Sequence, residues 1–263
     1  MRLADVAPEL PDTLIELISA GPRILDEVRR AAARGAPQPL ASVRLLAPVP
    51  QPPEFLGIGL NYRDHALEAG LAVPATPTVF NKQTSSIVGP NDDVVLPKVS
   101  GQLDYEGELG LVVGHAGRNL SLVDAAAAIF GYVIVNDLSV RDWQFLSPTV
   151  TLGKSFDTHG PMGPWVVTAD EVPDAQNLAV TTTVNGEVRQ SGNTSDMIFG
   201  CCAIVAFLSQ VMTLQPGTVI TTGTPAGVGL CRQPPSYLRG GDRVTVAISG
   251  LGRLENRVIA ETD

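Results

Sequence analysis

The stretch LDYEGELGLVV, residues 103–113, begins with acidic residues and continues as an apolar strand. Side chains on a strand alternate between its two faces, so Asp104, Glu106 and Glu108 are expected on the same face. Carboxylates held that close repel one another and resist desolvation, so a partner must compensate for them. The candidates are a metal cation, an arginine or lysine side chain, or solvent.

Composition indicates a well-buried globular protein. The chain has 263 residues, of which 44% are hydrophobic and 17% charged, and its formal net charge is −9. This length suits one large domain or one domain with a small appendage. No run of lysine and arginine forms a basic stripe, which argues against nucleic acid and anionic membranes as partners.

No targeting or membrane segment stands out in the sequence. The N-terminus lacks an apolar signal region, and no apolar run approaches the roughly 20 residues of a membrane span. The three cysteines have no metal-site spacing, and Cys201 and Cys202 are expected on a buried helix in reduced form. We therefore predict a cytoplasmic protein.

The pattern along the chain predicts two parts. Residues 12–35 show helical periodicity in two pieces broken at Gly21-Pro22, and a proline-rich passage follows at 47–55. We predict a small N-terminal module over residues 1–50 and a main domain over residues 51–263. In the main domain short apolar strands dominate, with helices expected only over 62–70, 121–129 and 195–212. The fold class is therefore a strand-dominated α+β fold with few helices.

Two acids of the opening stretch form a candidate metal site with a third acid. Gly107 lies between Glu106 and Glu108 and leaves the opposite face uncrowded, while Asp137 follows the apolar strand YVIVN. Three oxygen ligands without histidine or cysteine suit a hard cation, Mg²⁺ or Mn²⁺. The alternative is an edge strand with solvated acids. Asp104 is the weakest member, because it can equally cap the turn before the strand.

Other candidate residues cluster in nearby motifs. The stretch NDLSVRDWQ carries Arg141 and Gln144, and GKSFDTHGPMGP carries Lys154. A structural ion pair and a solvated lysine are the alternatives for the two cations. His65 and Glu68, three residues apart, would meet on one helical turn, where a carboxylate orients the imidazole as a base or forms only a surface ion pair.

The loop TTGTPAGVG at 221–229 follows an apolar strand. It is either an anion-binding loop that offers backbone donors and the Thr224 hydroxyl, or a tight turn.

Taken in order, six blocks of this sequence resemble the fumarylacetoacetate hydrolase family over residues 55–260. These blocks are GLNYRDHALE, DYEGELGLVVG, NDLSVRDWQ, GKSFDTHGPMGP, VNGEVRQ…TSDMIF and TTGTPAGVG. The resemblance implies a mixed β-sandwich or β-roll barrel and a homodimer. It implies Mg²⁺ or Mn²⁺ on Glu106, Glu108 and Asp137. It further implies a His65–Glu68 catalytic dyad, substrate contact through Lys154, and substrate binding by Arg141, Gln144 and Thr224.

The reaction expected from these residues is metal-dependent hydrolysis of a C–C bond in a small 2,4-dioxo acid of the acylpyruvate or fumarylpyruvate type. A 2-oxo acid can chelate the ion through its ketone and carboxylate, and the ion and Lys154 stabilise the enolate that cleavage leaves. Decarboxylation of oxaloacetate-like acids and isomerisation of 2-hydroxy-dienedioates use the same enolate. The dyad favours hydrolysis, because decarboxylation needs no activated water. A metal-binding homologue without catalytic activity is a further alternative.

Overall fold

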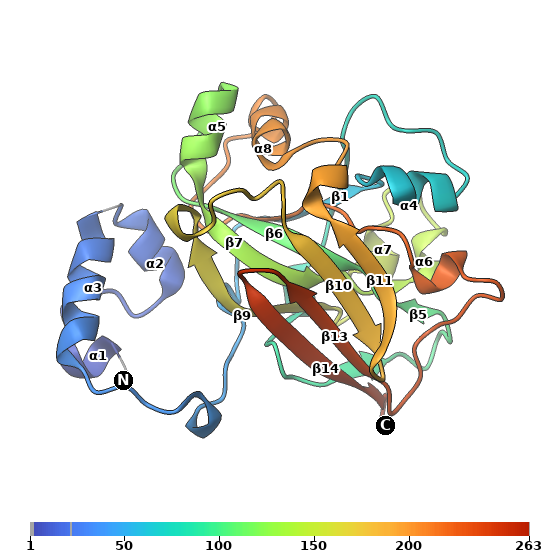
Figure 1. Cartoon of the computed structure of the whole chain (residues 1–263), viewed down its shortest axis with the longest axis horizontal. Helices are drawn as coiled ribbons and strands as arrows, with labels where there is room; N and C mark the ends of the chain where they lie inside the picture. The colour runs from blue at the N-terminus through green and yellow to red at the C-terminus, as the bar shows by residue number, and fades with distance from the viewer. Residues whose placement is uncertain (1–2, 22, 263) are drawn as a thin grey trace.

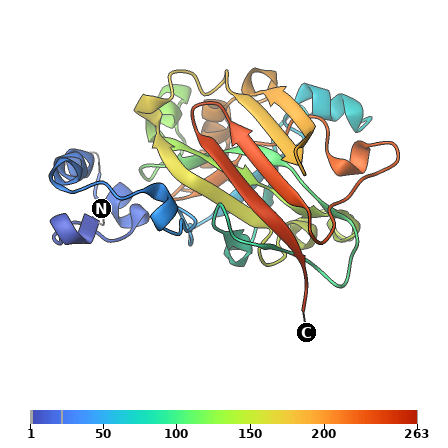
Figure 2. The same cartoon turned by 60° about the horizontal axis from the view of Figure 1, so that its bottom comes forward.

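Two β-sheets pack face to face and form the main body (Figures 1 and 2). The computed structural model describes residues 3–21 and 23–262. The larger sheet has the strand order β2-β1-β12-β6-β7-β9-β3 and the smaller sheet the order β11-β10-β13-β14-β4. Leu109 and Ile134 from the first sheet share one core with Val180 and Val246 from the second. The strand-dominated α+β class predicted from the sequence is confirmed.

The strands of the two sheets are short, as the sequence predicts. The larger sheet contains β1 (Phe55–Gly59), β2 (Thr78–Asn81), β3 (Ile87–Val88), β6 (Gly107–Val113), β7 (Ile129–Asn136), β9 (Gly160–Thr168) and β12 (Val219–Thr221). The smaller sheet contains β4 (Val94–Leu96), β10 (Ala179–Val184), β11 (Glu187–Asn193), β13 (Arg243–Ile248) and β14 (Gly252–Ala260). A separate pair joins β5 (Leu103–Asp104) to β8 (Ser139–Val140).

The helices lie around the sheets and in the N-terminal part of the chain (Figure 1). They are α1 (Leu3–Val6), α2 (Leu14–Ser19), α3 (Arg23–Arg34), α4 (Arg63–Glu68), α5 (Leu122–Ala128), α6 (Arg141–Gln144), α7 (Thr151–Lys154) and α8 (Cys201–Ser209). The helix expected over 195–212 is only α8, because Gly200 caps its start. None of the helices in the described ranges has the length and hydrophobicity that crossing a bilayer requires.

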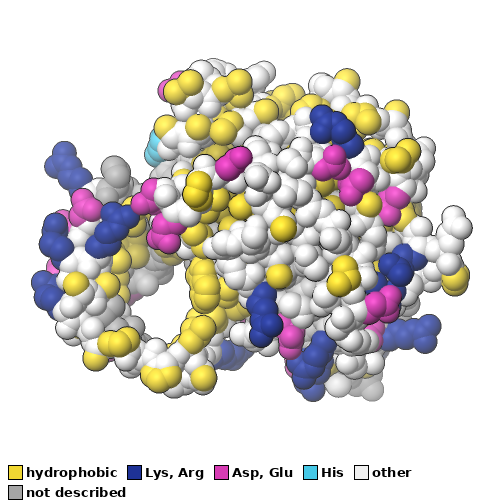
Figure 3. All heavy atoms as spheres, viewed as in Figure 1, with side chains coloured by type: hydrophobic (Ala, Val, Ile, Leu, Met, Phe, Trp, Pro, Cys, Tyr) yellow, Lys and Arg dark blue, Asp and Glu magenta, His cyan; other side chains and the backbone are white. Residues whose placement is uncertain are grey.

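The N-terminal helices form a small cluster that also touches the main body. Ala7, Leu10 and Ala31 pack together, whereas Ile18 of α2 joins the cluster that contains Phe55 of β1. The predicted helix break holds at Gly21, and Pro22 lies outside the described residues. The segment of residues 35–54 links these helices to β1 and exposes the apolar side chains of Leu40, Val43 and Leu46. In Figure 3, hydrophobic side chains border the gap between the N-terminal helices and the main body. The boundary at residue 50 stays a prediction.

The opening stretch is divided and does not run as one strand. Strand β5 ends at Asp104, and β6 begins at Gly107, which lies opposite Asn136 of β7. Asp104 instead lies opposite Ser139 in the small β5–β8 pair. The expectation that three acids share one face of one strand was therefore wrong for Asp104, because the chain changes sheet at Tyr105 and Glu106.

Gly107, the first residue of β6, lies between Glu106 and Glu108 and allows the two sheets to approach each other closely there. A Cβ atom at this position would clash with Thr182 Oγ1 on β10 and would lie 2.9 Å from Val246 Cγ1 on β13. Both neighbours are buried and cannot move aside easily. The glycine predicted to keep the opposite side of the strand uncrowded has this role.

We expect Gly107→Ala to lower the free energy of unfolding by about 1–3 kcal/mol, because overpacking forces side chains and backbone to shift. Urea denaturation measured by circular dichroism checks this. Gly101→Ala is the matched control, because a Cβ there meets no atom within 4 Å. Equal stability of the two variants would contradict the close packing at Gly107.

Candidate active site

Glu106, Glu108 and Asp137 meet in one buried cluster. Each offers a carboxylate oxygen, and these oxygens all lie within 4.8 Å of one another. Because β6 and β7 are adjacent antiparallel strands, the start of β6 lies beside the residue that follows β7. The predicted convergence of acids from two separate segments is confirmed.

Two cations predicted from the sequence neutralise part of this cluster. Lys154 Nζ lies 2.6 Å from both Glu106 Oε2 and Asp137 Oδ2, and Arg141 Nη1 lies 2.7 Å from Glu106 Oε1. Burial raises the pKa of Glu106, but the charges of Lys154 and Arg141 outweigh it and hold that pKa at about 2. Burial likewise lowers the pKa of Lys154, and Asp137 and Glu106 reverse the shift, so the lysine is protonated.

Glu108 is short of positive charge. Its Oε2 accepts a hydrogen bond from Gly223 N at 2.8 Å. Burial and then the charges of Asp137 and Glu106 raise its pKa well above the ordinary value, despite the opposing charge of Lys154. A divalent cation among the three acids would supply the missing charge. The all-oxygen donor set and this charge deficit fit Mg²⁺ or Mn²⁺.

Lys82, which the sequence reasoning missed, also belongs to the cluster. It directly follows β2, its side chain is fully buried, and its Nζ lies 2.6 Å from Asp137 Oδ1. The same Nζ donates to the backbone carbonyl oxygen of Lys154. Burial lowers its pKa, and the charge of Asp137 opposes the shift. The available signal was a lysine placed at the end of an apolar strand, TVFNK.

Asp104 holds Arg141 and does not join the acid cluster. Its Oδ2 accepts from Arg141 Nε and pairs with Nη2, both at 2.8 Å. Its Oδ1 and Oδ2 also accept backbone hydrogen bonds from Gly229 and Leu230 at 2.7 and 2.9 Å. Asp104 thus fixes both the guanidinium and the loop that follows β12.

The predicted dyad forms on helix α4. His65 Nδ1 and Glu68 Oε1 are 2.8 Å apart. Gly227 N donates to both oxygens of Glu68, at 3.0 and 2.9 Å, so the carboxylate is held from the loop side as well. When Nδ1–H donates to Glu68, the other ring nitrogen carries the lone pair of a general base.

A cavity of about 300 Å³ brings most of the predicted residues together. Its polar lining includes His65, Glu106, Glu108, Arg141, Gln144, Lys154 and Thr224, and its apolar lining includes Phe80, Phe145 and Leu230. Gln144 Oε1 accepts from Arg141 at 2.9 Å. The Thr224 hydroxyl donates to Gly107 O at 3.0 Å and accepts from Gln190 at 2.7 Å, which ties the loop to β6 and β11. Asp137 and Glu68 do not line this cavity, but each contacts a residue that does: Asp137 contacts Lys154, and Glu68 contacts His65.

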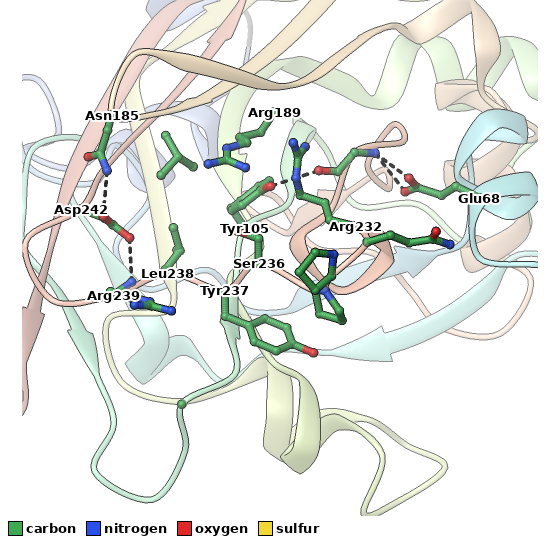
Figure 4. A pocket seen from close by; sticks show the side chains of 16 residues that line it. Glu68, Tyr105, Asn185, Arg189, Arg232, Ser236, Tyr237, Leu238, Arg239 and Asp242 are labelled. Carbon is green, nitrogen blue, oxygen red and sulfur yellow. Dashed lines mark hydrogen bonds between the residues drawn. The ribbon is translucent and has the colours of Figure 1, made fainter.

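A larger groove of about 830 Å³ lies on the other side of the loop after β12 (Figure 4). Glu68 and Gly227 line this groove, whereas His65 lines the smaller cavity. Tyr105, next to Glu106 in sequence, donates its hydroxyl to Gly227 O at 3.1 Å, as Figure 4 shows. The loop after β12 therefore separates the groove from the cavity. Of the predicted dyad, Glu68 lines the groove and His65 lines the cavity.

Comparison with known proteins identifies the family of this chain. The sequence profile of the fumarylacetoacetate (FAA) hydrolase C-terminal family matches residues 54–259. The chain belongs to the fumarylacetoacetate hydrolase family. It is 44% identical to a human mitochondrial protein named oxaloacetate tautomerase, over 96% of this chain and 81% of the relative.

Solved structures of this family have the same fold. The fumarylacetoacetate hydrolase of Exiguobacterium antarcticum aligns with a TM-score of 0.85 and 42% identity, over 97% of this chain and 91% of that chain. Maleylpyruvate hydrolase of a Sphingobium species, solved with manganese(II) and pyruvate, aligns with a TM-score of 0.82 and 34% identity, over 94% of this chain and 86% of that chain. This chain is an enzyme of the same superfamily.

The raised pKa of Glu108 and the lowered pKa of Glu106 predict opposite effects on the free energy of unfolding when these residues are replaced, in protein stripped of metal with EDTA. A raised pKa means that ionised Glu108 destabilises the fold once the pH exceeds the carboxyl pKa of the unfolded chain. Glu108→Gln should therefore raise the free energy of unfolding at pH 7. Glu106 has a lowered pKa, so its carboxylate stabilises the fold at any pH above the carboxyl pKa of the unfolded chain. Glu106→Gln should cost roughly 3 kcal/mol, as expected when a buried ion pair loses one partner.

Urea denaturation at pH 7 measures both effects, and calorimetry with Mn²⁺ should show weakened binding in both variants. Destabilisation by Glu108→Gln as large as that by Glu106→Gln would contradict the charge deficit at Glu108.

Proposed function

We propose that this enzyme catalyses keto–enol tautomerisation of a small 2-oxo dicarboxylate of the oxaloacetate type, with Mg²⁺ or Mn²⁺ on Glu106, Glu108 and Asp137. The observation that carries the proposal is one small cavity lined by His65, by the Lys154 ammonium and by Glu106 and Glu108, with Glu68 and Asp137 in contact with this lining. The human relative named oxaloacetate tautomerase supports this choice of substrate. Tautomerisation conserves every atom and needs only a proton moved between carbon and oxygen.

The residues of the chain divide this work. His65 takes the proton from the carbon next to the ketone and then returns it to the ketone oxygen, so that the enol forms and the imidazole is neutral again. Glu68 holds the imidazole in the basic tautomer. Lys154, protonated and buried, stabilises the negative charge that develops on the ketone oxygen. Arg141, held by Asp104, binds a substrate carboxylate together with Gln144. The divalent ion, when bound, acts as a Lewis acid toward the 2-oxo acid.

Part of the cavity wall is apolar. Phe80, Phe145 and Leu230 line the space together with the charged groups, and the Phe80 ring lies 5.0 Å from Lys154 Nζ. In a site of low dielectric the lysine and arginine charges act more strongly on the substrate than they would in water. A homodimer and a cytoplasmic location remain predictions.

Decay of the enol absorbance of oxaloacetate tests the proposal. With Mg²⁺, we expect a rate well above that of the buffer, no release of pyruvate beyond that of the Mg²⁺ buffer without enzyme, and loss of activity in EDTA. His65→Ala should lower kcat by about 10²-fold or more, the usual contribution of a general base. His115→Ala is the matched control, because His115 is exposed on a loop and lies outside the cavity lining. Wild-type activity in His65→Ala would overturn the role of the dyad.

Hydrolysis of an acylpyruvate is the second candidate. The dyad favours it, because an oriented imidazole can also activate water, and the maleylpyruvate hydrolase structure bears pyruvate, one product of such a cleavage. An assay coupled to lactate dehydrogenase detects released pyruvate. Metal-dependent pyruvate release from acylpyruvate at a higher kcat/KM than the tautomerisation of oxaloacetate would make hydrolysis the principal activity.

A further inference from the structure

The two oxygens of Asp137 have unlike partners. Oδ2 pairs with Lys154 Nζ and Oδ1 with Lys82 Nζ, each at 2.6 Å. Lys154 also pairs with Glu106, lines the cavity and lies 5.0 Å from the centre of the Phe80 ring. Lys82 does not line the cavity. Oδ2 is therefore paired with the lysine that lines the cavity, and Oδ1 is paired with the lysine that is buried in the protein interior.

Lys82 is fixed more firmly than Lys154. Its ammonium donates to the Lys154 carbonyl oxygen, which ends helix α7, and lies 3.5 Å from the Leu138 carbonyl oxygen. Its third close oxygen is Asp137 Oδ1, which forms an ion pair with it at 2.6 Å. Withdrawal of Lys82 would leave buried acceptors unpaired, which costs about 1–3 kcal/mol for each. Lys154 pairs through Nζ with the two carboxylates, whose charge an arriving cation would neutralise.

We propose that Lys82 is a positioning residue that keeps Asp137 Oδ1 away from the ion. Asp137 then binds through Oδ2 alone, and the site selects Mg²⁺ or Mn²⁺ over Ca²⁺. Ca²⁺ takes six to eight oxygens and often binds a carboxylate through both atoms, whereas Mg²⁺ requires a near-octahedral set of single oxygens. The inference rests on the divalent-ion site of the proposed function and adds its selectivity.

Calorimetric titration of metal-free enzyme with Mn²⁺, Mg²⁺ and Ca²⁺ tests this selectivity. The wild type should bind Ca²⁺ more weakly than Mg²⁺. Lys82→Met removes the ammonium but keeps a long buried side chain, and we expect it to raise Ca²⁺ affinity relative to Mg²⁺ by about tenfold or more, in the range that supporting residues contribute at metal sites.

Lys154→Met is the matched control. It also removes one buried positive charge in contact with Asp137, but it leaves Oδ1 paired with Lys82. Loss of charge alone should strengthen the binding of all three ions in both variants and leave the affinity ratio unchanged. A ratio that changes only in Lys82→Met supports the proposal. An unchanged ratio, or the same change in both variants, overturns it.

Two further results keep the outcomes separate. Absence of divalent-ion binding by the wild type would refute the metal site itself and not the selectivity alone. A crystal structure of the wild type with Ca²⁺ covers the case in which Lys82→Met does not fold. Asp137 bound through one oxygen, with Lys82 still on Oδ1, is the expected result, and bidentate Asp137 would overturn the proposal.

Discussion

A buried network of charges determines the architecture of the active site. Four carboxylates, Asp104, Glu106, Glu108 and Asp137, lie in contact with or close to Lys82, Arg141 and Lys154. When all are ionised, the network carries one net negative charge, which is unfavourable for an anionic substrate. A divalent cation reverses the sign to one net positive charge. The charge balance of the cavity therefore depends on whether an ion occupies the acid cluster.

Sequence reasoning found the parts of this network that short spacing determines. Glu106 and Glu108 are two residues apart with a glycine between them, and Asp137 directly follows β7, the strand that pairs with β6. His65 and Glu68 are three residues apart on a helix, which places them in contact. Such patterns follow from strand and helix geometry, so they can be read without the tertiary structure. The six ordered blocks then gave the family.

The missed parts depend on contacts between distant segments. Lys82 reaches Asp137 across 55 positions of sequence, and Asp104 reaches Arg141 because the chain passes from β5 to β6 at Tyr105. The local pattern of Asp104 suggested a shared face with Glu106, but strand pairing with Ser139 overrides it. Helices α6 and α7 have four residues each, too few for a periodic signal. Burial is the property that distinguishes Lys82 from a surface lysine, and one sequence does not show it.

The loop after β12 contacts three separate parts of the site. Its backbone N–H groups donate to Glu108 at Gly223, to Glu68 at Gly227 and to Asp104 at Gly229. A Cβ at Gly227 would clash with the carbonyl oxygen of Arg189, so glycine is required for this close approach. The same short segment therefore holds Glu108 of the acid cluster, Glu68 beside His65 and Asp104 beside Arg141. Because each contact uses a backbone N–H, the glycine-rich composition suits this convergence of three carboxylates. A displacement of the loop would disturb the acid cluster, the His65–Glu68 pair and the Asp104–Arg141 pair together.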